Sequence, residues 1–252
     1  ENTLSLHDAL PIFAARRAAN GWNGVATSAV FPSNTWLVDG GHGQHFNLGW
    51  GVASLYFNPH VWPGAGSSFG CAYVVFNGIR AKWFELAAEN GALGYPVTDE
   101  RYYGGGAYQY FDKGAVFWKA ALGTVVLPRE LAVRHLELMR AGGAAFPTWS
   151  GTTASQPAGQ TALLENGARL FAKGGGAAFV VDGAILARYQ ALGGALSFLG
   201  YPIADAQTTA AGTRSQRFEG GTLFSGADMD LGVLIQAGAL REPRPLPDRP
   251  GQ

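Results

Sequence analysis

Apolar side chains recur at helical spacing in two widely separated parts of the chain. They are Ile79, Trp83 and Leu86 in the first part, and Ile185, Tyr189 and Leu192 in the second. Residues at i, i+4 and i+7 share one face of a helix, and an apolar face packs against a core. We therefore predict two helices, starting near Gly78 and Gly183, with these aromatic side chains in the core. We expect Gly91 and Gly193–Gly194 to end them, because glycine tolerates the left-handed backbone of a C-cap.

Short runs of β-branched and aromatic residues predict strands between the helices. The runs are Val52–Phe57, Ala72–Phe76, Val116 with Phe117 after a turn at Gly114, Thr124–Leu127, Phe179–Val181 and Val233–Ile235. The stretch from Arg101 to Tyr110 contains three consecutive glycines, and we predict a connecting loop there. One helix and a small β-hairpin are the elements expected in each unit.

The predicted helices and strands belong to a repeated segment. Leu-Gly-Tyr-Pro follows the helical pattern at 93–96 and again at 199–202, and Leu131–Arg140, also helical in pattern, precedes Ala-Ala-Phe-Pro at 144–147. With Pro32, the equivalent prolines lie about 50 to 65 residues apart, a period typical of repeat architectures. Such a unit is too small to bury its own apolar face, so it packs on its neighbours. We predict an α+β repeat fold of about four units, at residues 13–77 (diverged), 78–130, 131–182 (diverged) and 183–238.

The two ends of the chain are expected to lie outside this repeat. Residues 2–12, Asn-Thr-Leu-Ser-Leu-His-Asp-Ala-Leu-Pro-Ile, can be back-translated into a common sequencing adaptor. We interpret residues 1–12 as a sequencing artefact and expect the true N-terminal part to be missing, so a signal peptide cannot be observed. Residues 239–252 are rich in proline and lack an apolar period, which predicts an extended, disordered tail.

The repeated segment resembles the LGFP repeat family, through Leu-Gly-Tyr-Pro and the later Phe-x-x-Gly at 111–114 and 218–221. Residues 144–147 depart from the pattern, and the first unit lacks the Leu-Gly pair. The resemblance implies a secreted, cell-envelope-associated protein of actinobacterial type. It also implies a pseudo-symmetric, propeller-like or ring arrangement that anchors proteins to wall polysaccharide, often beside a hydrolase or acyltransferase domain.

Composition excludes several classes of protein. The 252 residues are 47% hydrophobic and 14% charged, so the chain can bury a core. Lys+Arg and Asp+Glu both number 18, which argues against a nucleic-acid partner. No apolar run approaches the roughly 20 residues that a spanning helix needs. The single cysteine, Cys71, precedes an apolar run and is expected to be a buried, inert thiol.

Motifs for catalysis or metal binding are weak, and we predict neither a catalytic residue, a metal nor another cofactor. Gly66-Ser-Ser-Phe-Gly70 fits Gly-x-Ser-x-Gly, but a nucleophile elbow needs a strand before it and a helix after it, which is the reverse of the pattern here. His42 and His45 have only Asp39 as a third metal ligand nearby. Carboxylates such as Glu130 and Glu137 are not in runs that would bury them and raise the pKa of a general acid.

Aromatic residues at loops and strand ends are the main candidates for ligand binding, because sugars stack on aromatic rings while charged and amide groups bind their hydroxyls. Packing against the next unit is an equal alternative for each. For the two aspartates, an alternative role is to accept backbone hydrogen bonds in the turn after the proline. The candidate residues are Asp99, Arg101, Tyr103, Tyr108, Trp118, Trp149 and Asp205.

We predict a non-catalytic binding module that anchors to cell-wall polysaccharide, located outside the cell or in the wall and monomeric. Two alternatives stay open. The chain could be the targeting portion of a secreted hydrolase or acyltransferase whose catalytic domain is missing from this fragment. It could also be a structural surface protein that contacts other proteins.

Overall fold

The computed structural model describes residues 6–19, 25–32, 41–58, 72–153, 158–210, 212–226 and 233–235. The chain divides into two compact units, which we describe separately. Unit 1 comprises residues 1–151 and 162–166, and unit 2 comprises residues 152–161 and 167–252.

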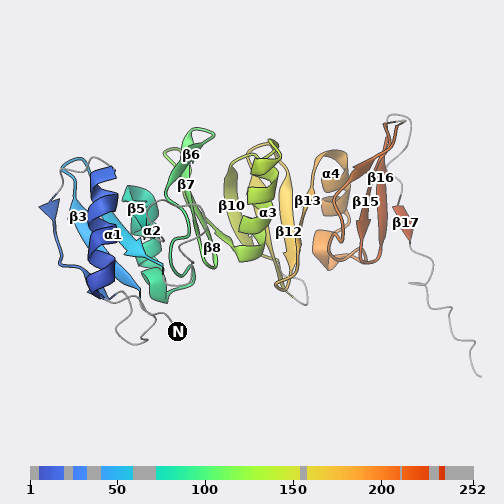
Figure 1. Ribbon diagram of the computed structural model, residues 1–252. Helices are drawn as coiled ribbons and strands as arrows, with labels where there is room; N and C mark the ends of the chain where they lie inside the picture. Colours follow the sequence, from blue (N-terminus) through green and yellow to red (C-terminus); the bar gives the residue numbers. More distant parts are fainter. Residues whose placement is uncertain are drawn as a thin grey trace, which may run out of the picture. The chain divides into compact units, whose positions relative to one another are not determined.

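Unit 1 alternates helices with antiparallel sheets (Figure 1). Helix α1 (Leu6–Ala19) precedes a sheet of strand order β1-β3-β4-β5, in which β2 also pairs with β3. The second sheet has the order β6-β7-β8-β9 and is flanked in sequence by helices α2 and α3. The bounds are β1 Val25–Ala26, β2 Phe31–Pro32, β3 His42–Asn47, β4 Val52–Phe57, β5 Ala72–Phe76, α2 Asn77–Glu85, a 3-10 turn η1 Ala88–Asn90, β6 Arg101–Tyr103, β7 Gly106–Phe111, β8 Gly114–Lys119, β9 Gly123–Pro128 and α3 Arg129–Arg140.

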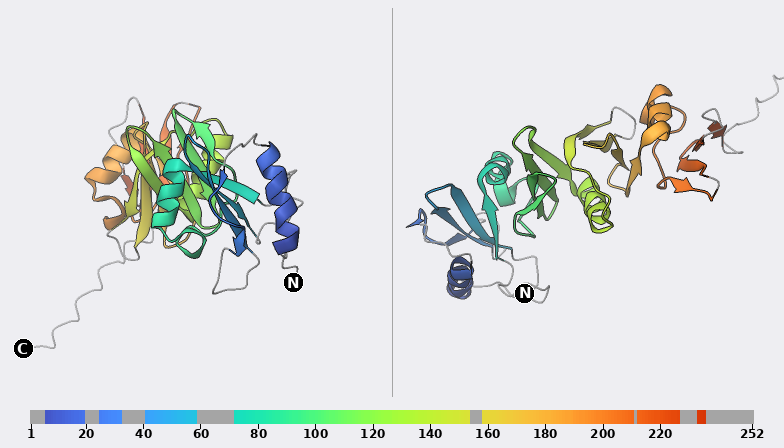
Figure 2. Two further views of the ribbon diagram at one scale, coloured as in Figure 1. Left: turned by 90° about the vertical axis from the view of Figure 1, so that its left-hand side faces the viewer. Right: turned by 90° about the horizontal axis from the view of Figure 1, so that it is seen from above.

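Helix α2 lies between the two sheets of unit 1 and joins their cores (Figures 1 and 2). Its Ile79 and Trp83 are buried in a cluster that takes Tyr56 and Val75 from the first sheet and Phe111 from the second. The Trp83 ring packs edge-on against Tyr56, with centroids 4.8 Å apart. Within unit 1, one small repeat therefore completes its core with the next repeat, as expected for a repeat protein.

The third sheet has the order β10-β11-β12-β13, and the boundary between the two units falls within its residues. Unit 2 continues with α4, a 3-10 turn η2 and a fourth sheet of order β14-β15-β16-β17. In unit 2, Ile185 and Tyr189 of α4 are buried with Phe171, Phe218 and Leu223. The bounds are β10 Pro147–Thr152, β11 Gly159–Leu164, β12 Arg169–Lys173, β13 Ala178–Val181, α4 Gly183–Ala191, η2 Gly194–Leu196, β14 Gln207–Thr208, β15 Arg214–Phe218, β16 Gly221–Ser225 and β17 Val233–Ile235.

The α+β fold and the three predicted helices are confirmed, but each repeat contains a sheet of four or five strands instead of the predicted hairpin. The four sheets are antiparallel with four or five strands, and none of them closes into a barrel within the described residues. The predicted loop at residues 101–110 is instead the hairpin of β6 and β7. Gly104 and Gly105 both have positive φ (57° and 75°), which suits a tight two-residue turn.

The predicted helix ends are right for α4 and wrong for α2. Gly193 has φ 102°, in the left-handed region that ends α4 as expected. In α2 the left-handed residue is Ala87, with φ 66°, whereas Gly91 is extended. Gly91 is needed for another reason: a Cβ there would lie 1.6 Å from the carbonyl oxygen of Leu86.

Several predictions fall on residues that the structure does not describe. They concern Asp39, Gly66–Gly70, Cys71 and the tail at 239–252. Residues 6–12 form the first half of α1, and their interpretation as a translated adaptor stays a prediction.

Candidate functional site

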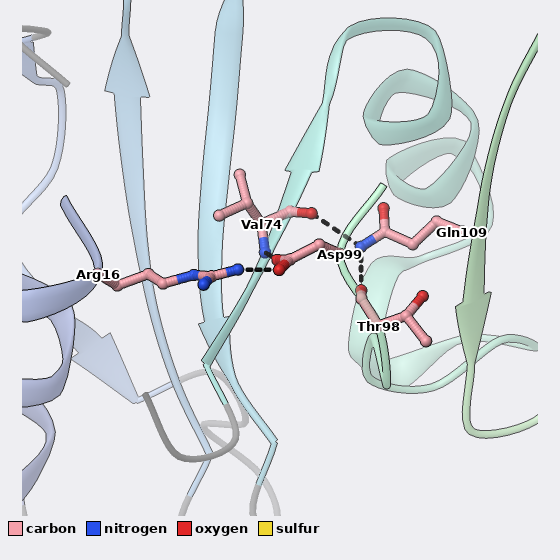
Figure 3. Close-up of polar contacts among 5 residues, drawn as sticks. All are labelled: Arg16, Val74, Thr98, Asp99 and Gln109. Carbon is pink, nitrogen blue, oxygen red and sulfur yellow. Dashed lines mark hydrogen bonds and ion pairs between the residues drawn. The ribbon is translucent and has the colours of Figure 1, made fainter. Parts of the chain in front are cut away.

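Asp99 and Gln109 bind the backbone at the free edge of strand β5 (Figure 3). Asp99 precedes the second sheet, and Gln109 lies on its strand β7. Asp99 Oδ1 accepts the backbone N–H of Val74 at 3.1 Å, and the amide of Gln109 donates to the carbonyl of Val74 at 2.8 Å. The same amide donates to the carbonyl of Thr98 at 2.7 Å, and Arg16 of α1 pairs with the other oxygen of Asp99. Val74 therefore has both backbone groups bound by side chains instead of by a further strand.

Unit 2 repeats this clamp with equivalent residues. Asp205 Oδ1 accepts the N–H of Val180 at 2.9 Å, and Gln216 donates to the carbonyls of Val180 and Ala204 at 2.7 and 2.9 Å. In unit 1, Ser150 lies three residues after its proline, as the aspartates do, and its hydroxyl donates to the Val126 carbonyl of β9 at 2.6 Å.

Asp99 and Asp205 thus have a structural role that differs in detail from the expected one. We expected turn donors next to the proline, but each carboxylate binds the last strand of the preceding sheet. An edge strand with unpaired N–H and C=O groups invites pairing with another chain, and capping its groups with side chains prevents this. The two aspartates therefore link successive sheets through these hydrogen bonds.

The Leu-Gly-Tyr-Pro segments are fixed from two sides. The indole N–H of Trp83 donates to the carbonyl of Gly94 at 2.9 Å, and the hydroxyl of Tyr189 donates to the carbonyl of Gly200 at 2.6 Å. In the diverged repeat at residues 131–182, His135 has the same role, because its Nε2 lies 2.9 Å from the carbonyl oxygen of Ala145. Three different ring donors therefore perform one structural task.

An acidic residue fixes the other side of each segment. Asp112 accepts the N–H of Tyr95 at 3.0 Å, and Glu219 accepts the N–H of Tyr201 at 3.0 Å. Partial burial tends to raise the pKa of Glu219, but the Lys173 ammonium and the Tyr201 N–H outweigh it and lower that pKa. Lys173 pairs with Glu219 at 2.5 Å, and Lys119 pairs with Glu165 in the equivalent position.

A groove of about 640 Å³ lies between the β6–β7 hairpin and helix α3 in unit 1. Tyr108 and Tyr110, both 7% exposed, line it from β7. The Tyr108 ring is stacked on Phe117, with centroids 5.7 Å apart, so it is rigidly held. Val133, 49% exposed, and Met139 line the groove from α3. The volume is in the usual range of about 300 to 1,000 Å³ for small-molecule sites.

Three arginines surround this groove. Arg101 extends from β6, where it pairs in register with Tyr108, and Arg129 and Arg140 stand at the two ends of α3. Arg129 donates to the backbone carbonyl of Asp112 at 2.9 Å. Burial and the neighbouring Tyr108 raise the pKa of Tyr110, and the positive charge of Arg140 acts in the opposite direction. The groove therefore combines a mainly apolar lining with a positively charged rim.

The predicted ligand-binding residues do not gather in one place. Arg101 and Tyr108 line the groove, but Trp118 lies on the opposite face of the same sheet, beside the N-terminus of α2. The hydroxyl of Tyr103 donates to the carbonyl of Ala144, which is a structural contact. Trp149, on β10, is 47% exposed and does not line the groove. The six predicted residues of unit 1 thus do not form one shared site.

His45 makes polar contacts within the first sheet. The Nδ1 of His45 lies 2.8 Å from the hydroxyl of Ser54, which also accepts a hydrogen bond from Arg80 at 2.6 Å. Burial and then the Arg80 charge lower the pKa of His45. In the part of the chain that the structure describes, no group of three or more His, Cys, Asp or Glu could hold a metal.

Two functional features escaped sequence reasoning. One is the groove wall from α3, where Val133, Leu136 and Arg140 stand at i, i+3 and i+7 beside the buried stripe. The other is the buried amide of Gln109. Its repetition at Gln216, again two residues before the phenylalanine of Phe-x-x-Gly, was the available signal.

The structure defines the chain as an α+β repeat protein whose successive sheets are linked by helices and polar clamps. Residues 93–140 match the LGFP repeat family, which confirms the resemblance drawn from Leu-Gly-Tyr-Pro. No curated protein matches the chain. Within the described residues no helix is long and apolar enough to cross a membrane.

Proposed function

We propose that this chain is a non-catalytic binding module that holds a polysaccharide of the cell wall in the groove between the β6–β7 hairpin and α3. The observation that carries the proposal is the groove itself, with rigid tyrosines and aliphatic side chains along its walls and hydrogen-bond donors at its rim. Sugars present apolar faces and hydroxyls together, and such a mixed lining suits both.

The position of the groove supports this proposal. It lies within residues 93–140, the stretch that matches the LGFP repeat, and its walls come from two elements of that one repeat. By the family resemblance, we further propose an extracellular or wall location, a monomeric state and a ring-like packing of the repeats around a shared axis.

A sedimentation assay with insoluble wall polysaccharide from a GC-rich Gram-positive bacterium tests the proposal. The full chain should be retained, and Val133→Trp should lose retention, because an exposed side chain enlarged on the groove wall fills the groove without altering the core. Val52→Trp, the same change at a 45% exposed position on β4, is the matched control and should be retained like the wild type. Equal retention of the wild type and folded Val133→Trp would refute a role for the groove.

Contact with other proteins is a second candidate function, favoured by the apolar surface of unit 2. Leu196 and Phe198 are 68% and 56% exposed and line one hollow next to the Lys173–Glu219 pair. Exposed apolar clusters are typical of surfaces that contact other proteins. If Phe198→Glu abolishes retention on wall material that still contains protein, while Val133→Trp does not, this second function replaces the first.

A further inference from the structure

We propose that the groove selects an anionic polysaccharide, one whose sugar units carry carboxylate or phosphate groups. This inference rests on the proposed function and specifies its ligand. It starts from the charges around the groove, where three arginines face a single carboxylate, that of Asp112.

The carboxylate of Asp112 is already engaged by groups outside the groove. Its Oδ1 accepts a hydrogen bond from the amide of Asn58 at 3.1 Å, and its Oδ2 accepts the backbone N–H of Tyr95 at 3.0 Å. Asn58 is fully buried, so this arrangement belongs to the core. The negative charge is therefore tied to the Leu-Gly-Tyr-Pro segment and is poorly placed to pair with an arginine at the rim.

The arginines themselves are available. Neither Arg101 nor Arg140 forms an ion pair with any residue that the structure describes, and both side chains are exposed. Arg129 donates through Nη1 to a backbone carbonyl, which orients its guanidinium without neutralising it. A planar guanidinium binds carboxylate and phosphate groups in a bidentate manner, and this geometry explains why arginine predominates in such sites.

The positive charge is local, because the whole chain has a formal net charge of zero. General attraction to any polyanion is therefore weak, and a preference for anionic ligands must come from the groove. The aromatic and aliphatic lining between the arginines distinguishes this surface from a purely basic patch. Tyr110 and Met139 meet across it, with the phenol oxygen 4.0 Å from the sulfur. Sugar rings can contact this lining while their acidic groups reach the rim.

Calorimetry with a matched pair of polymers tests the inference. Polygalacturonate and its methyl ester have the same backbone and linkage and differ only in the charge of the carboxyl group. The full chain should bind the charged polymer at least about tenfold more tightly, since a hydrogen bond to a charged acceptor is stronger than one to a neutral acceptor. A poly(glycerol phosphate) arm shows whether the preferred anion is a carboxylate or a phosphate. Binding should weaken with added salt, because exposed charges are screened.

Variants assign the preference to the groove. Arg101→Gln combined with Arg140→Gln should strongly reduce the difference between the charged polymer and its ester, because only Arg129 then remains at the rim. Arg217→Gln removes one exposed charge from unit 2 and should leave the difference intact. The inference is wrong if neither charged polymer binds more tightly than the neutral ester. It is also wrong if the double variant keeps the full preference for the charged polymer. If the inference fails but the wild type is still retained on wall polysaccharide and Val133→Trp is not, the proposed function stands. If the wild type binds none of these polymers in any assay, both proposals are refuted.

Discussion

Replacement of Gln109 by methionine tests how the repeats are joined. Gln109 is fully buried, and its amide satisfies the carbonyls of Val74 and Thr98 at 2.8 and 2.7 Å. Methionine has a similar length but no donor, so two carbonyl groups lose their partner in a place that water does not reach. An unsatisfied buried acceptor costs about 1 to 3 kcal/mol. The loss for two carbonyls, reduced by the gain from a more apolar side chain, is expected to be about 2 to 4 kcal/mol.

Urea denaturation followed by tryptophan fluorescence measures this loss. All seven tryptophans lie between Trp22 and Trp149, in the residue range of unit 1, so the signal reports the unit that contains Gln109. Lys113→Met introduces the same side chain at an exposed turn and should change the unfolding free energy by less than about 0.5 kcal/mol. If Gln109→Met falls within that range as well, the clamp on β5 contributes nothing and the reasoning is wrong.

Three further predictions concern backbone strain and a buried histidine. Ala87→Gly should stabilise unit 1 by about 0.5 to 1 kcal/mol in the same assay, because Ala87 has φ 66° and the equivalent Gly193 is free of that strain; an unchanged midpoint would contradict this. Gly200→Ala should accelerate hydrogen exchange in α4 more than Gly194→Ala does. Both glycines have φ near 60°, but only at Gly200 would a Cβ meet a carboxylate, at 2.4 Å, and equal effects would exclude a steric cause. Burial lowers the pKa of His135, although the Ala145 carbonyl opposes this. The unfolded chain then takes up the proton first, so stability is full at neutral pH and falls below about pH 6.5; His135→Gln, which keeps a donor, should show a smaller fall, and an identical pH profile would refute the assignment.

The helices were predictable because their signal is local. Ile79 and Trp83 are four residues apart, and burial of that face requires only that some neighbouring element packs against it. The short apolar runs gave β5 and β9 for the same reason. Residues 101–110 were misjudged because the glycines dominated the pattern, although Tyr108 and Tyr110 alternate with Ala107 and Gln109 as in a strand.

The candidate site was less predictable because its parts meet only in three dimensions. Arg101 and Tyr108 were selected for their composition, and they line the groove with Arg140, about forty residues away in sequence. Asp99 was selected as well, yet its partner is the backbone of Val74 in the preceding sheet. A backbone partner leaves no trace in the identity of the residue that it binds, so the sequence alone could not reveal this role.

Helices α2 and α4 each pack against two sheets, and this affects how such chains can change in length. The match to the LGFP repeat runs from residue 93 to residue 140, from the start of one Leu-Gly-Tyr-Pro segment through the sheet to the end of the next helix. The hydrophobic core around Trp83 crosses the first of these limits. It joins helix α2, which precedes residue 93, to the second sheet, which lies within the match. A gene duplication with those limits inserts a sheet ready to receive the upstream helix, and a helix ready to receive the downstream sheet. New copies can therefore be added or lost without any junction having to evolve a new interior, and a ring donor such as Trp83, His135 or Tyr189 can drift independently in each copy.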